Sequence, residues 1–109
     1  MAFDEHLAKR VRAAMSLHKG MTEKKMFGGI GFLLNGNMCV GVWKDSLIVR
    51  LGPEQSAVAL KQPHVGEFDI TGRAMKGWAM VAPPGLRDDE RLFEWIERSV
   101  TFVKDLPAK

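Results

Sequence analysis

The feature of this sequence that most restricts its fold is an Asn35-Gly36 pair between two apolar runs. A tight hairpin turn needs positive φ angles at its two central residues, and Asn followed by Gly adopts them readily. Segments 30–34 and 37–43 are therefore predicted to pair as antiparallel strands. A second polar pair, Lys44-Asp45, precedes segment 46–51, in which every second residue is a large aliphatic one, the period of a strand with one buried face. Together these segments predict a three-stranded meander.

Helical patterns flank this meander on both sides. From Phe3 to Met15 apolar residues recur at helical spacing, and Gly20 ends the pattern. Gly52-Pro53-Glu54 is typical of a helix start, and the short helix that follows should end before Pro63. The last helix begins at 88–90, where three acids suit the positive end of the helix dipole, and it continues with an apolar stripe.

Two further strands are predicted between the short helix and the last one. The first is centred on Phe68 and Ile70, after a loop at 64–67, and the second occupies 78–82. The sequence thus predicts an α+β fold of two layers, an antiparallel five-stranded sheet with helices in the order α-β-β-β-α-β-β-α. At 109 residues it should form one domain, residues 1–109, with a single hydrophobic core.

Composition indicates an ordinary globular protein, since 46% of the residues are hydrophobic and 27% are charged. The single Cys39 excludes an internal disulfide and is typical of a reducing compartment. The N-terminal residues are charged where a signal peptide needs an apolar stretch, and no segment approaches a membrane span. We therefore expect a cytoplasmic protein without membrane contacts. The net charge of +3 is too small and dispersed to identify a nucleic-acid binder by itself.

The sequence contains no recognisable catalytic or metal-binding pattern. His6, His18 and His64 have no partner at metal-ligand spacing, and Cys39 lies within a predicted strand without a C-x-x-C motif or an adjacent base. The glycines at 28–31 precede a strand instead of a helix, which argues against a phosphate loop and favours a bulge or a tight strand entry. We predict a protein that is not an enzyme and needs no cofactor.

The last helix carries more apolar surface than one sheet face usually needs. Trp95, Phe102 and Leu106 lie beside its main stripe and widen the apolar arc to roughly half of the circumference. Either the domain folds over this flank or the flank contacts a partner, which includes a second copy in a homodimer. Burial in the core is favoured, because large apolar residues are more often core than interface.

Four motifs in the right order resemble the N-terminal domain of the TfoX family, the bacterial competence regulators also called Sxy. The motifs are M-F-G-G at 26–29, the following G-F and N-G, L-I-V-R-L-G-P at 47–53, and G-R-A-M-K-G-W at 72–78. The resemblance extends from about Leu7 to Val103. It implies an antiparallel sheet similar to that of secretion chaperones and a role in transcriptional control, since full-length members are coactivators of competence genes with the cyclic AMP receptor protein. It brings no catalytic residues with it.

Full-length competence regulators have a second, C-terminal domain, whereas this chain ends at Lys109, so we expect a stand-alone domain that can keep the fold and change its partner. The expected function is a protein-interaction module that acts as an accessory regulator of transcription. The alternatives are a weak, non-specific nucleic-acid binder with a basic face and a small-molecule-binding domain. The cations that are candidates for an interaction surface, either gathered at one end of the sheet or merely solvated in turns, are Lys24, Lys25, Arg50, Arg73 and Lys76.

Overall fold

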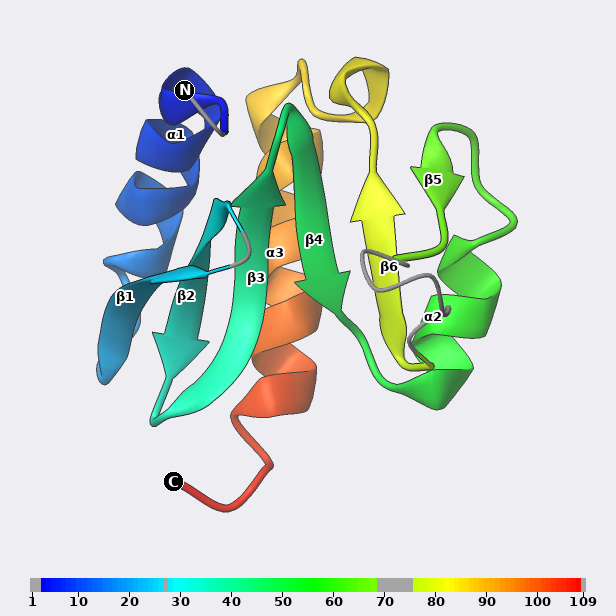
Figure 1. Ribbon diagram of the computed structural model, residues 1–109. Helices are drawn as coiled ribbons and strands as arrows, with labels where there is room; N and C mark the ends of the chain where they lie inside the picture. Colours follow the sequence, from blue (N-terminus) through cyan, green and yellow to red (C-terminus); the bar gives the residue numbers. More distant parts are fainter. Residues whose placement is uncertain (1–2, 27, 69–75, 109) are drawn as a thin grey trace.

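The computed structural model describes residues 3–26, 28–68 and 76–108 of the chain. In these residues three α-helices and one 3-10 turn accompany a single antiparallel sheet (Figure 1). The elements, in chain order, are α1 (Glu5–Met15), β1 (Met21–Met26), β2 (Gly29–Leu34), β3 (Asn37–Trp43), β4 (Ser46–Arg50), α2 (Pro53–Ala59), β5 (Val65–Gly66), β6 (Trp78–Val81), η1 (Pro83–Gly85) and α3 (Asp89–Val103).

The predicted meander is confirmed as β2, β3 and β4. Asn35 and Gly36 both have positive φ, 53° and 83°, as the predicted turn between β2 and β3 requires. Lys44 also has a positive φ, 54°, in the turn between β3 and β4. The β2–β3 register shifts between Phe32 and Leu33, a bulge that the sequence did not indicate.

The fold class is confirmed, although the sheet has one strand more than predicted, in the order β1-β2-β3-β4-β6-β5. The additional strand is β1, which was not predicted because its sequence, MTEKKM, lacks the alternation of a half-buried strand. The next difference is the position of β5, which lies at Val65–Gly66, within the predicted 64–67 loop. Phe68 follows that strand, and Ile70 lies outside the described residues.

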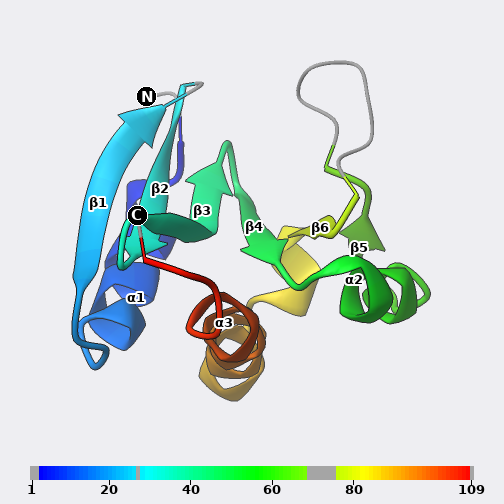
Figure 2. The ribbon, with the colours of Figure 1, turned by 90° about the horizontal axis from the view of Figure 1, so that it is seen from below.

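The two-layer arrangement is visible along the sheet in Figure 2, where α1 and α3 lie on the same side. Asp4 and Asp88 cap these helices, since their carboxylates accept hydrogen bonds from Leu7 N and Glu90 N respectively. α2 packs beside β6 near the far edge of the sheet. The core lies between the sheet and the two capped helices and includes fully buried Phe32 and Ile96. Within the described residues, no helix has the length and apolar character needed to cross a membrane.

Cys39 on β3 is fully buried in this core, and burial raises the pKa of its thiol to about 12. Since the thiolate is the reactive form, we expect native protein to resist a thiol reagent such as DTNB at mildly alkaline pH and guanidinium-unfolded protein to react fully. The pKa of Cys39 in the folded protein lies above its ordinary value of 9.0. Burial of the neutral thiol therefore contributes to the free energy of unfolding fully below pH 9, and this contribution is lost as the pH rises from 9 to about 12. Rapid labelling of the native chain would contradict this prediction.

Candidate functional site

The side of the sheet opposite α1 and α3, called here the open face, carries its own small apolar cluster. Strand residues alternate between faces, so that Leu47 and Val49 of β4 face the core while Ile48 and Arg50 point to the open face. Ile48 is only 3% exposed and Phe68 5%, yet neither belongs to the main core cluster. The open face therefore carries buried apolar side chains of its own, on the side of the sheet that α1 and α3 do not cover.

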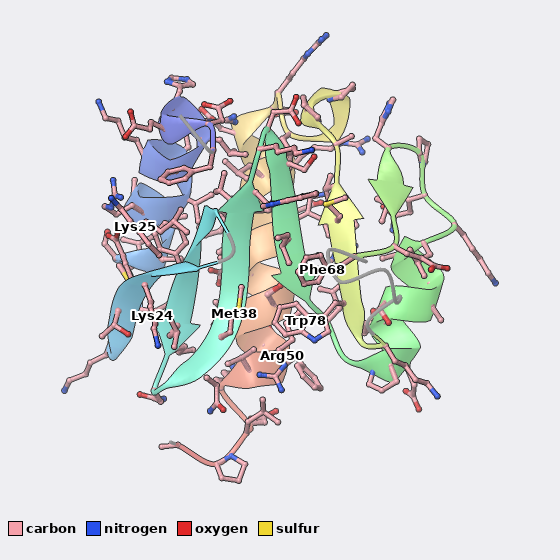
Figure 3. All side chains as sticks on the ribbon, in the orientation of Figure 1. Lys24, Lys25, Met38, Arg50, Phe68 and Trp78 are labelled. Carbon is pink, nitrogen blue, oxygen red and sulfur yellow. The ribbon has the colours of Figure 1, made fainter. Side chains whose placement is uncertain are left out.

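Arg50 lies at the edge of this surface in a setting built from three strands and one helix. It pairs across the sheet with Trp78 on β6, and its guanidinium carbon lies 5.4 Å from the Trp78 ring centroid. The same guanidinium carbon lies 6.0 Å from the ring centroid of Phe102 on α3. Arg50 Nη1 donates a hydrogen bond of 3.3 Å to the carbonyl oxygen of Met38 on β3. Phe68 contacts Trp78 with 5.7 Å between ring centroids. We call these five residues the Arg50 cluster (Figure 3).

Among the residues that the structure describes, the Arg50 cluster positions a cation without neutralising it. Within the described residues, Arg50 has no carboxylate at salt-bridge distance, whereas Arg10 and Arg12 each have one. A guanidinium carries five N–H donors, and a single described hydrogen bond engages Arg50. Aromatic rings beside a guanidinium hold its plane in place and leave its edge free for a carboxylate or phosphate. The cluster is thus suited to binding an anionic group next to an apolar one.

Two of the other predicted cations, Lys24 and Lys25, lie away from Arg50 (Figure 3). The register of β1 against β2 places Lys24 opposite Gly31 on the open face and Lys25 opposite Ile30 on the helix face, so these neighbours point in opposite directions. Lys76 is exposed in the turn before β6, and Arg73 lies outside the described residues. Lys24 and Lys25 therefore do not form one cationic patch, because β1 is a strand whose residues alternate between faces.

The apolar flank of α3 divides between core and surface. Trp95 is 5% exposed and belongs to the core cluster, with Arg98 over its ring at 4.9 Å. Its side chain is not available as a partner surface, in agreement with the favoured interpretation of this flank as core. Phe102 is half-buried, packs against the core and also reaches the Arg50 cluster. Its position therefore links α3 to the open face.

Sequence reasoning missed three members of the cluster, Met38, Phe68 and Trp78. Trp78 had a usable signal, because it is out of phase with Ala79 and Val81, which face the core on β6. Met38 had no such signal, because the β2–β3 register shifts next to its partner Leu33. Phe68 had none because it lies in a loop. In the part of the chain that the structure describes, no group of three or more His, Cys, Asp and Glu residues is placed to hold a metal ion.

Comparison with protein-family models matches the chain to the TfoX N-terminal domain over residues 13–103. The chain belongs to the TfoX N-terminal domain family. Neither a curated protein nor a solved structure matches it in the corresponding comparisons. All members of the Arg50 cluster and the whole of β1 lie inside the matched TfoX region, whereas the first two turns of α1 precede it.

Proposed function

We propose that this TfoX-family chain is a non-enzymatic protein-interaction module that acts as an accessory regulator of transcription, with the Arg50 cluster as its contact surface. Membership of the family supports a regulatory or interaction role. The observation that carries the proposal is the Arg50 guanidinium held beside Trp78 and Phe102 with no carboxylate partner among the described residues.

The composition of this cluster is that of a binding hot spot. Trp and Arg dominate the residues that contribute most to protein–protein affinity, and Met and aromatic residues are enriched in interfaces. Here Arg50, Trp78 and Met38 occur together on the sheet face away from α1 and α3 (Figure 3). The expected complement is an acidic side chain next to an apolar one on the partner.

The distribution of charge supports a protein partner over nucleic acid. Binding along a phosphate backbone needs several cations on one surface. In this chain Lys24 and Lys25 point to opposite faces, and Arg12 and Arg10 are each paired with a carboxylate. Arg50 is therefore better suited to a local contact with one acidic group than to a phosphate track.

The test is affinity capture of the full chain from its native cells, with and without nuclease, followed by mass spectrometry. We expect a transcription factor or RNA polymerase subunit to remain bound after nuclease treatment and to bind the purified chain directly. Loss of every partner with the nucleic acid would instead favour the non-specific nucleic-acid binder. A small molecule that copurifies while no protein is captured would favour the ligand-binding domain.

Arg50→Glu should weaken binding to that purified partner by at least about 30-fold, the effect of removing a hot spot worth about 2 kcal/mol. Arg98→Glu is the matched control, because Arg98 also lies over a tryptophan ring but on the outer side of α3. Isothermal titration calorimetry with both variants measures the difference. Equal affinity of the Arg50 and Arg98 variants would remove the Arg50 cluster from the interface while leaving the regulatory role open.

A further inference from the structure

A second surface, separate from the Arg50 cluster, lies at the free edge of the sheet. β1 is the terminal strand, and β2 is its neighbour in the sheet. The β1–β2 register is unbroken from Met21 opposite Leu34 to Met26 opposite Gly29, and β1 contains no proline or described bulge. Residues 22–25 are exposed. An edge of this length presents alternate unpaired N–H and C=O groups, which are a template for a further strand.

A groove runs beside this edge, on its helix side. Figure 2 shows α1 beneath β1 and β2, and the space between them has a volume of about 400 Å³. Its apolar floor comes from Phe3, Ala8 and Ile30. Its polar walls are the side chains of Glu5, His6, Lys9 and Arg12 from α1 and of Glu23 and Lys25 from β1.

An ion pair joins the two walls of the groove. Arg12 Nη2 donates to Glu23 Oε1 at 2.9 Å, and Arg12 Nε donates to Glu23 Oε2. The hydrogen bond and the opposite charge raise the pKa of Arg12 and lower the pKa of Glu23, so both groups are ionised at neutral pH. Arg12 and Glu23 therefore neutralise each other in the groove. Within the described residues, Lys9 and Lys25 have no carboxylate at salt-bridge distance.

We propose that β1 and this groove together bind an extended acidic segment of another protein by strand addition. Backbone groups of the segment pair with the free edge of β1, and every second side chain enters the groove between β1 and α1. One of these side chains is an aspartate or glutamate that contacts Lys9 and Lys25. Another, two residues away, is aliphatic and packs on Phe3 and Ile30. The proposal goes beyond the regulatory role, because it concerns a different surface and stands without it.

The charges of β1 disfavour a second copy of this chain as the occupant. Two copies of β1 that pair around a two-fold axis must oppose residues from the same face. The central registers then place Glu23 against Glu23 or Lys24 against Lys24, and like charges directly opposite each other destabilise a strand pair. The second register also brings Glu23 opposite Lys25, but the Glu23 carboxylate is already paired with Arg12. An acidic segment instead places unlike charges together at Lys25.

The experiment selects binders of the full chain from a displayed library of random twelve-residue peptides. We expect enriched peptides to carry Asp or Glu two positions from an aliphatic residue. The double variant Lys9→Glu/Lys25→Glu should bind the most enriched peptide at least about tenfold more weakly, since attraction is replaced by repulsion at two positions. Lys24→Glu is the matched control on the other face of the same strand, and its affinity should stay within about twofold of the wild type.

Backbone amide shifts in NMR spectra locate the bound peptide, and we expect changes in residues 21–26. Failure to enrich acidic peptides would overturn the proposal, as would an equal loss of affinity in the Lys24→Glu variant or shifts confined to the Arg50 cluster. A dimer whose contacts map to β1 would assign this edge to a second copy and would also overturn it. The transcriptional partner at Arg50 is tested separately by affinity capture and the Arg50→Glu variant, so the two proposals fail separately.

Discussion

Replacing Phe32 with alanine is expected to lower the free energy of unfolding by about 3–5 kcal/mol. Phe32 lies on β2 in the middle of the core face and is fully buried. Removal of its ring forfeits the transfer free energy of the buried carbons and leaves a cavity that the surrounding strands and helices fill only in part. Because small domains have a total stability of about 5–15 kcal/mol, this one change can remove most of it. Urea unfolding followed by circular dichroism measures the loss.

Phe93→Ala is the control for this prediction, because Phe93 on α3 is 43% exposed. Its loss should be small, within about 1 kcal/mol, since much of the ring is already in water. If Phe32→Ala proves unfolded, Phe32→Leu supplies a folded variant whose midpoint must lie below those of the wild type and of Phe93→Ala. Similar midpoints for the Phe32 and Phe93 alanine variants would contradict the position of Phe32 in the core.

Gly52→Ala is expected to destabilise the fold by about 2–5 kcal/mol, from backbone strain and from overpacking. Gly52 has φ of +88°, where an L-residue is strained, and a Cβ atom there would lie 2.6 Å from Cε1 of Phe102. The ring would have to shift, and its contact with the Arg50 guanidinium would change with it. We therefore expect both a lower unfolding midpoint and, in NMR spectra, changed signals from the Arg50 and Trp78 side chains.

Gly77→Ala separates the two causes. Gly77 has φ of +92°, but its nearest contact to an added Cβ is an ordinary 3.6 Å. It should therefore show the strain without the clash, a loss of about 1–3 kcal/mol. In the double variant Gly52→Ala/Phe102→Ala the clash disappears, so the two losses should be less than additive. Strict additivity would contradict the predicted contact between the new methyl group and the ring.

Local signals were sufficient for the centre of the fold. The turn at Asn35-Gly36 and the period of segment 46–51 depend on the backbone preferences and burial of neighbouring residues, so the meander could be predicted directly. The acids at 88–90 likewise marked the start of α3 within a residue of its observed N-cap. A helix or strand that buries one face along its whole length shows the corresponding period of apolar residues in its sequence.

Edge strands do not have this property, and β1 shows why. Residues 22–25 of β1 are polar on both faces, and only Met21 among its described side chains packs against the core, so pairing with β2 holds the strand. Without β1 as a strand, Lys24 and Lys25 read as one cationic pair instead of two oppositely directed side chains. The short β5 was misplaced for a related reason, since two residues carry no measurable period.

The candidate site was predicted only in part, because its geometry depends on the order of strands. Arg50 and Phe102 were recognised individually, but their neighbour Trp78 is reached only because β6, not β5, lies next to β4. The position of β6 beside β4 depends on the path of the chain through α2 and the connection after it. No pattern in the described sequence there predicts which strands pair. Trp95 was correctly favoured as core on the general rule for large apolar residues.

The position of α3 in the chain has a consequence for synthesis. Strands β1 to β4 and β6 precede it, and the core face of β3 and β4, including Val40 and Val49, is covered in the finished protein by residues 89–103, while α1 contacts β2 and β3. A growing chain that has reached β6 therefore carries that face without its cover. At typical elongation rates, the stretch from 82 to 103 takes about 1–4 s to add. During this interval the nascent chain exposes an apolar sheet surface to which a holdase chaperone or a neighbouring nascent chain can bind.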